Sequence, residues 1–207
     1  MPIQLVTPPA EEPVSLAEAK RYLRVDFPDD DALITSLISA ARMAAETLTG
    51  RQLVTARWKL VLDGFPGPSR MGVPPGLPFS LPGHAILLPK CPVQSAFAIQ
   101  YLDMAGSTQT MPPEEYAVDT ACEPARITPV FGRIWPITLP QIGAVSVTFD
   151  AGYGPAASVP EGLKSWIKLR VGSLYAHREE VALLTRGSIA PLPFLDGLLD
   201  PYQVVLI

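Results

Sequence analysis

The sequence has little charge and few residues of the types that carry chemistry. Only 17% of its 207 residues are charged, against 48% hydrophobic, and it holds two histidines and two cysteines. A chain this apolar is not intrinsically disordered. Cys91 and Cys122 lie far apart, with no second cysteine or histidine close to either. Neither a zinc site nor a disulfide framework is therefore indicated, and we expect reduced, unpaired thiols.

Basic clusters and long apolar runs are also missing. Lys and Arg total 16 against 20 acidic residues, for a net charge of −4, and no run of four basic residues occurs. Tight nucleic-acid binding through a basic patch is therefore not expected. No apolar run approaches the ~18 residues of a membrane-spanning helix. The N-terminus also lacks the basic region and the apolar region that a signal peptide has. We expect a protein made without export and without a membrane segment.

Proline, in contrast, is abundant, and most of it lies between residues 66 and 140 or in the last 20 residues. The chain holds 24 prolines. Because proline lacks a backbone N–H and fixes φ, neither a helix nor a central strand can run through residues 64–83, where proline and glycine alternate with apolar residues. The sequence predicts a mobile loop there and an extended arm at the C-terminus.

Three segments have helical periodicity. Ser15 with Glu18 three residues later is typical of a helix start, and predicts a helix over 15–24. Asp29, Asp30 and Asp31 precede apolar residues at helical spacing that end at Gly50. We interpret the three acids as caps of that helix rather than as metal ligands, because the spacing of a calcium loop is absent. A third helix is predicted over 160–178, with Lys164 off its apolar face.

Alternating or short apolar segments between these helices predict strands. Residues 55–63 place Trp58, Leu60 and Leu62 on one face. Further short strands are expected near residues 84–89, 97–103, 115–119, 125–129 and 144–149, with a turn over 103–106. Together they predict an antiparallel module of about five or six strands.

The predicted fold class is α+β. A helical core of two N-terminal helices and one C-terminal helix would occupy residues 1–54 and 155–186. The antiparallel β module would be inserted over 55–154, and an extended, apolar arm would follow over 187–207. An arm this apolar is most simply explained by burial against another chain.

The stretch GYGPAA, from Gly152 to Ala157, matches the letter pattern of a dinucleotide-binding turn. Such a site needs the glycines to lead directly into a helix within a βαβ unit, whereas Pro155 and Pro160 delay the helix here. We therefore interpret Gly152 and Gly154 as a hinge between the β module and the helices. No catalytic, cofactor-binding or metal-binding residue is predicted, and no cofactor is expected.

Six segments, taken in order, resemble one family. They are PVSLAEAKRYLRVD, DDALITSLISAARMAAETLTGRQL, TARWKLVLDGFP, LLPKCPVQSAFAIQYLD, the YAVD…PARITP…WP series and FDAGYG…VPEGLKSWIKLRVGSLYAHRE. Over residues 13–181 the chain thus resembles the head-tail connector (adaptor) family of tailed bacteriophages and gene transfer agents.

This resemblance implies a structural protein rather than an enzyme. Members of the family form a ring, typically dodecameric, that joins the capsid portal to the tail-side neck protein, or stopper, and surrounds the DNA channel. It implies a homo-oligomer in the virion neck, assembled in the host bacterial cytoplasm, through which DNA passes without specific binding. It also assigns portal contact to the C-terminal arm, where the apolar residues are Pro193, Phe194, Leu195, Leu198, Leu199, Tyr202, Val204 and Leu206.

Two other functions stay open at this point. One is a stopper or tail-completion protein of the same neck region, which would bind the next ring rather than the portal. The other is a nucleotide-binding enzyme centred on Gly152 and Gly154.

Overall fold

The computed structural model describes residues 3–67, 85–177 and 197–204. These residues form two compact units. The β unit holds the residues up to Pro8 together with Ala56–Gly152, and the helical unit holds Pro9–Thr55 and the described residues from Tyr153 onward. The predicted α+β fold, with helices and an inserted antiparallel β module, is confirmed.

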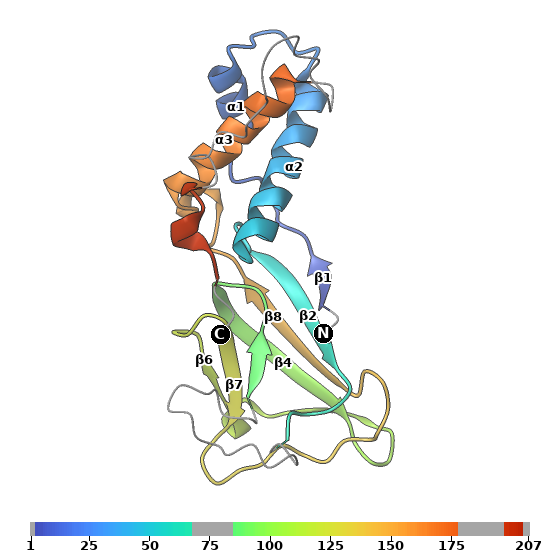
Figure 1. The fold of residues 1–207 in the computed structure, drawn as a ribbon. Coiled ribbons are helices and arrows are strands. Elements are labelled where there is room, and N and C mark those ends of the chain that lie inside the picture. Colours follow the sequence, from blue (N-terminus) through green and yellow to red (C-terminus); the bar gives the residue numbers. More distant parts are fainter. Residues whose placement is uncertain (1–2, 68–84, 178–196, 205–207) are drawn as a thin grey trace, which may run out of the picture. The chain divides into compact units, whose positions relative to one another are not determined.

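The helical unit contains the three predicted helices, α1 (Leu16–Leu23), α2 (Asp31–Thr49) and α3 (Glu161–Ala176). Figure 1 shows α2 and α3 running alongside each other. Their apolar faces enclose one core. Its largest fully buried side chains are those of Ile34, Ile38, Leu53, Leu163, Trp166, Ile167 and Leu199.

Both predicted helix-end signals are found. The Ser15 hydroxyl accepts a hydrogen bond from the Glu18 backbone N–H at 3.2 Å, and Gly50 ends α2 with φ of 71°. That φ lies in the left-handed region, which residues with a β-carbon rarely adopt. The Glu18 carboxylate accepts a hydrogen bond from Lys168 of α3 at 3.0 Å, so it joins two helices.

Asp30 and Asp31, at the start of α2, make contacts that differ from the predicted capping. Asp30 is the N-cap residue but makes no side-chain capping bond, and its carboxylate accepts a hydrogen bond from the Tyr175 hydroxyl of α3. The Asp31 carboxylate pairs with Lys20 of α1. The interpretation of Asp30 as a side-chain cap is therefore wrong, because its Oδ2 atom accepts a hydrogen bond from a tertiary partner instead. Asp31 does lie in the first turn, where the helix dipole favours negative charge.

The placement of Lys164 off the apolar face was also wrong. This side chain is buried, and its ammonium group donates to Glu161 at 3.1 Å. A lysine can bury its methylene stem along apolar surface while its charged end reaches a carboxylate near solvent. Helical spacing alone does not show this behaviour.

A nearly buried polar network ties the end of α2 to the chain on either side. Arg42 donates to Glu12 at 2.8 Å and to Glu46 at 2.9 Å. The second oxygen of Glu46 accepts from Gln52 at 2.7 Å and from the Leu53 backbone N–H at 3.2 Å. Each carboxylate oxygen of Glu46 is thus paired, as a buried charge requires.

Glu46→Ala is expected to lower the free energy of unfolding of the helical unit by about 3 kcal/mol, because it leaves the Arg42 guanidinium and the Gln52 amide underpaired in a buried position. Urea unfolding followed by circular dichroism at 222 nm measures this change. Asp26→Ala, at an exposed position of the same unit, is the control and should change it by less than about 0.5 kcal/mol. Equal stabilities of the two variants would contradict the role of the network.

The β unit is built on a five-stranded antiparallel sheet with the order β1-β2-β8-β4-β5. Its strands are β1 (Ile3–Thr7), β2 (Ala56–Leu62), β4 (Val93–Leu102), β5 (Thr108–Thr110) and β8 (Val145–Ala151). The four-residue turn over 103–106 joins β4 to β5 as predicted, with the Asp103 carboxylate accepting from two backbone N–H groups.

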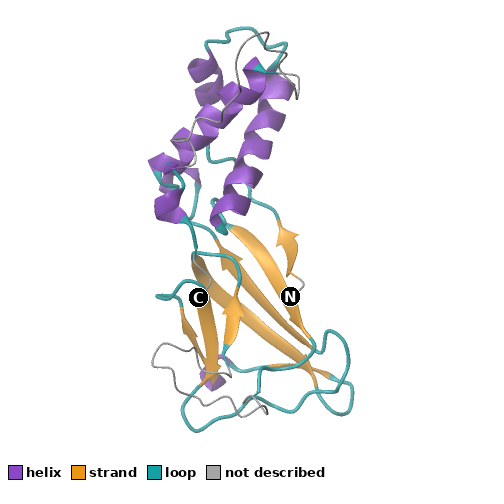
Figure 2. Ribbon diagram, in the orientation of Figure 1, coloured by secondary structure: helices purple, strands orange, loops and turns teal. Residues whose placement is uncertain are grey.

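A second, three-stranded antiparallel sheet has the order β3-β7-β6. Its strands are β3 (Ile86–Leu88), β6 (Tyr116–Asp119) and β7 (Ala125–Pro129), and Figure 2 shows the strands of both sheets in orange. Buried residues of the two sheets form one core, which includes Leu60, Leu88, Ile99, Ile127 and Phe149.

The described residues thus hold more strands than the five or six predicted. The edge strands β1 and β5 were missed, and residues 3–7, which the prediction assigned to the helical core, form the strand that pairs with β2. Both edge strands are exposed over most of their length, so they lack the buried face that produces an alternating pattern.

Candidate interaction surfaces

The described residues contain no cluster of three His, Cys, Asp or Glu side chains that could hold a metal ion. Within the same residues, no helix is long and apolar enough to cross a membrane. Every strand pair in that part of the chain is antiparallel, so the βαβ unit of a dinucleotide site is missing there. The functional candidates in the described residues are the glycines Gly152 and Gly154, the described part of the C-terminal arm and an apolar loop of the β unit.

Gly152 and Gly154 lie where the chain passes from the β unit to the helical unit, the boundary falling between Gly152 and Tyr153. Their φ angles are 132° and 123°, in the region that favours glycine. The Gly152 backbone N–H donates to Pro92 at 2.8 Å, and the Gly154 carbonyl accepts from Thr55 at 3.0 Å. A single-turn helix, η2 (Ala156–Ser158), then precedes α3, so the glycines do not open the helix directly. A hinge role for them stays a prediction.

Replacing both glycines by valine should destabilise the protein by about 1–3 kcal/mol at each position, because a β-branched residue is strained at these φ angles. Thermal unfolding measures this loss of stability. We expect no change in affinity for nucleotides. Gly67→Val is the matched control, since its added carbon meets open space and its φ is ordinary. An unchanged melting temperature in the double variant would rule out the conformational requirement.

The predicted portal-contacting residues divide into two groups. Leu198, Leu199, Tyr202 and Val204 are described, whereas Pro193, Phe194, Leu195 and Leu206 lie outside the described residues. Leu199 is 1% exposed, and Leu198 and Tyr202 pack against the same helical core. The Val204 backbone N–H donates to the Thr49 carbonyl at the end of α2 at 2.9 Å.

Residues 198–204 are thus held on the chain's own helical unit. The Arg51 guanidinium donates to the Tyr202 carbonyl and lies 5.9 Å from the centre of the Tyr153 ring. The Tyr202 ring approaches Gly162 so closely that a β-carbon there would lie 3.0 Å from the hydroxyl oxygen. In this conformation Leu198, Leu199 and Tyr202 pack on the helical core, and Leu199 offers no surface to a partner.

The most exposed apolar side chains of the described chain lie in one loop of the β unit, residues 130–143. Phe131 and Ile142 are more than 90% exposed, and Ile134 and Ile137 are nearly as open. Isolated exposed apolar residues are ordinary, but several in one loop mark an interaction site. Leu139 of this loop donates to the Leu102 carbonyl at the end of β4, at 3.0 Å.

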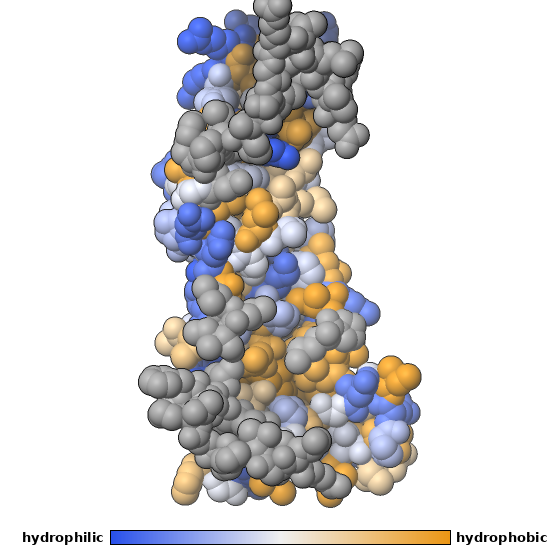
Figure 3. Space-filling view, in the orientation of Figure 1, coloured by the Kyte–Doolittle hydropathy of each residue, from blue (hydrophilic) through white to orange (hydrophobic). Residues whose placement is uncertain are grey.

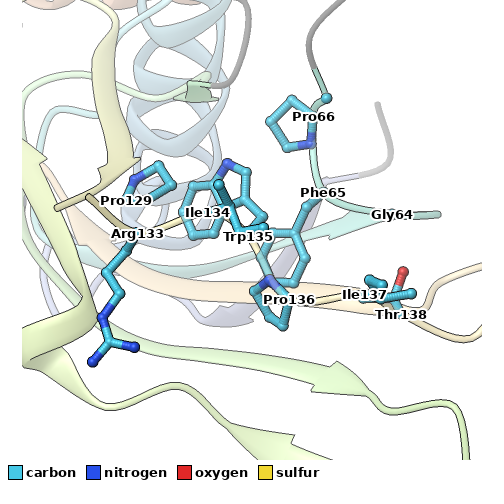
Figure 4. A pocket seen from close by; sticks show the side chains of 11 residues that line it. Gly64, Phe65, Pro66, Pro129, Arg133, Ile134, Trp135, Pro136, Ile137 and Thr138 are labelled. Carbon is cyan, nitrogen blue, oxygen red and sulfur yellow. The ribbon is translucent and has the colours of Figure 1, made fainter. Parts of the chain in front are cut away.

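The same loop borders a cavity of about 680 Å³. Figure 4 shows Phe65 and Trp135 at its centre, with their rings stacked at 4.7 Å between centroids. The remaining lining residues are mostly proline, glycine and isoleucine, with Arg133 and Thr138 as the polar ones. Its chemistry suits an apolar side chain of a partner better than a charged small molecule.

Sequence reasoning missed this surface. No helix, strand or site residue was predicted over residues 130–143, whereas the structure buries Trp135 and exposes the apolar residues around it. The signal was available: the segment VFGRIWPITLPQIG carries five large aliphatic residues between turn-forming prolines and glycines, where connecting loops usually carry polar residues.

Cys122 has an altered acidity. The Asp119 carboxylate, held by Arg126 at 2.8 Å and by the Ala121 backbone N–H at 3.0 Å, accepts a hydrogen bond from the thiol. That hydrogen bond to the neutral thiol, together with partial burial, raises the pKa of Cys122. The thiolate is therefore disfavoured near neutral pH.

Asp119→Asn is expected to accelerate alkylation of Cys122 by iodoacetamide at pH 8, because the pKa of the thiol falls toward its ordinary value and more thiolate forms. Peptide mass spectrometry measures the rate at Cys122, with buried Cys91 as the unreactive internal reference. Glu114→Gln, at an exposed position of the same unit, is the control and should react like the wild type. A rate unchanged by Asp119→Asn would exclude the proposed hydrogen bond.

Comparison with known proteins finds a family match over part of the chain and a shared fold over all of it. Residues 13–82 match the family described as phage gp6-like head-tail connector protein. A comparison with curated proteins finds no match. A chain of the structure described as the neck of an empty GTA particle, computed with C6 symmetry, is 23% identical with a TM-score of 0.75, covering 100% of this chain and 97% of that chain.

Two further structures agree with this result. A chain from the virion of a native gene transfer agent (GTA) particle is 22% identical with a TM-score of 0.77, and one from the neck of a native GTA particle, computed with C12 symmetry, is 22% identical with a TM-score of 0.70. Each covers 100% of this chain and 97% of that chain. Residues 13–82 thus match the model of the phage gp6-like head-tail connector family, and the chain as a whole has the fold of chains found in gene transfer agent particles.

Proposed function

We propose that this protein is a structural component of a virion neck, a head-tail connector that joins capsid to tail and has no enzymatic activity. The observation that carries the proposal is the pairing of two matches. Residues 13–82 match a connector family, and the whole chain shares its fold with chains of gene transfer agent particles. The apolar loop over 130–143 supports it, since a connector binds neighbours through exposed surfaces rather than through a catalytic cleft.

The connector forms a ring, dodecameric by analogy with the family, around the channel through which DNA passes. A ring needs a heterologous contact, in which two different surfaces of the chain meet. The net charge of −4 suits a wall that DNA slides past, because phosphate-binding Lys and Arg would retain it. The portal lies on one side of the ring and the tail-side stopper on the other. Assembly takes place in the cytoplasm of the host bacterium.

Mixing the purified protein with the portal of the same particle, followed by negative-stain electron microscopy, tests the function directly. The expected result is a second ring stacked on the portal. A protein that binds only a preformed connector ring would be a stopper instead. A thermal shift with a panel of nucleotides tests the enzyme alternative, and the expected shift is zero.

We propose further that portal binding uses the part of the arm before the residues that pack on the helical unit. Phe194→Asp with Leu195→Asp is expected to weaken portal binding at least tenfold, because a charge in an apolar contact loses its hydration without a partner. Surface plasmon resonance on immobilised portal measures the affinity. Deleting residues 190–207 is a poorer test, since it also removes Leu199 from the core.

Ser173→Asp, at an exposed position of α3, is the matched control and should bind the portal like the wild type. Circular dichroism should give the same melting temperature for all three proteins. Wild-type affinity of the arm variant would show that the portal is bound elsewhere.

A further inference from the structure

The outward face of α2 carries no charged residue. Eight side chains of this helix are exposed, and all are small, hydroxylic or apolar. They are Ala32, Leu33, Thr35, Ser36, Ala40, Met43, Thr47 and Leu48. Met43 is 57% exposed and Leu48 is 54% exposed, although a helix that faces water normally presents charged and polar residues on that side.

The few charges of α2 are used inside the helical unit. Asp31 pairs with Lys20 of α1, and Arg42 and Glu46 belong to the network that reaches Glu12 and Gln52. Arg42 and Glu46 are nearly buried, with side chains 12% and 10% exposed. The outward face of α2 is therefore uncharged along the full length of the helix.

The other two helices of the unit differ. The exposed residues of α1 include Arg21, and those of α3 include Glu161 and Arg170. Figure 3 shows blue, hydrophilic atoms gathered over α1. Since all three helices pack on the same core, the contrast points to a partner that covers α2 alone.

The chemistry of this face restricts the partner. Without Lys or Arg the face has nothing to neutralise phosphates, so it does not bind DNA. It also lacks the basic and aromatic residues of a helix that lies on a membrane. A charged protein surface would lose hydration there without gaining an ion pair. The partner surface is therefore another uncharged protein face.

We infer that the outward face of α2 packs against a second copy of this chain. The inference rests on the proposed function, in which copies surround one axis, as in the necks computed with C6 and C12 symmetry. The composition of the face supports the inference, because the centres of protein–protein interfaces are depleted of charged residues. Among α1, α2 and α3, α2 is the one whose exposed residues are all uncharged.

The dimensions fit the centre of an interface. From Leu33 to Leu48 the face is about 22 Å long at 1.5 Å per residue, and about 10 Å wide. A stable interface buries about 800 Å² per partner, so this face supplies its dry middle and surrounding residues supply the rim. Ala32, Ser36 and Ala40 recur every four residues, which leaves room for close approach of the neighbouring chain.

The test places two charges on the face of the full-length chain, in Ala40→Glu with Met43→Glu. Both positions are exposed, so the helical unit should keep its melting temperature by circular dichroism. Self-association is measured by sedimentation velocity over a range of concentrations, and ring formation on the portal by electron microscopy. We expect self-association at least tenfold weaker than that of the wild type, and incomplete rings.

Arg170→Glu with Ser173→Glu, at exposed positions of α3, is the matched control and should assemble like the wild type. Normal assembly of the α2 variant beside an assembling wild type would overturn the inference and leave the proposed function intact. Loss of portal binding with unchanged self-association would assign the face to the portal and also overturn it. A wild type that neither self-associates nor forms rings on the portal would overturn the inference and the ring together.

Discussion

The antiparallel pairing of β2 with β8 is the contact on which the rest of the structure depends. The register sets Ala56 opposite Ala151 and Leu62 opposite Val145. Since β2 is the first strand of the insertion and β8 the last, the pairing brings together the two points where the chain leaves and rejoins the helical unit. The Leu53 carbonyl can then accept from the Tyr153 backbone N–H at 2.9 Å. Without the pairing of β2 with β8, packing α3 against α1 and α2 would require closing a very long flexible loop, which costs conformational entropy.

The helical unit in turn depends on polar contacts that join its distant segments. Lys168 binds Glu18, Tyr175 binds Asp30 and Arg42 binds Glu12, each pair linking elements that are far apart or separated by the insertion. Such contacts fix the register of helices whose apolar faces alone would allow sliding. The charged residues of α2 itself, Asp31, Arg42 and Glu46, are likewise paired within the unit, and the exposed positions of this helix hold uncharged residues.

Two exposed surfaces of the described residues are the main functional candidates. The loop over 130–143 exposes large apolar side chains in the β unit, and α2 offers an uncharged face in the helical unit. The proposed connector would need such separate surfaces, because a ring built by one repeated contact joins two surfaces that differ. Leu198, Leu199 and Tyr202 are packed on the helical core, which is why the proposed portal contact is assigned to the part of the arm that precedes them.

The sequence by itself determined the three helices, their ends at Ser15 and Gly50, most of the strands, the α+β class and the connector resemblance. These features follow from local periodicity and from turn residues, which act over a few positions. Only the tertiary structure decided that residues 3–7 join the sheet, that Lys164 is buried and that Asp30 binds Tyr175. It also decided that Leu199 fills the core while Phe131 is left exposed. Burial depends on which distant segment packs against a residue, and hydropathy along the chain does not contain that information.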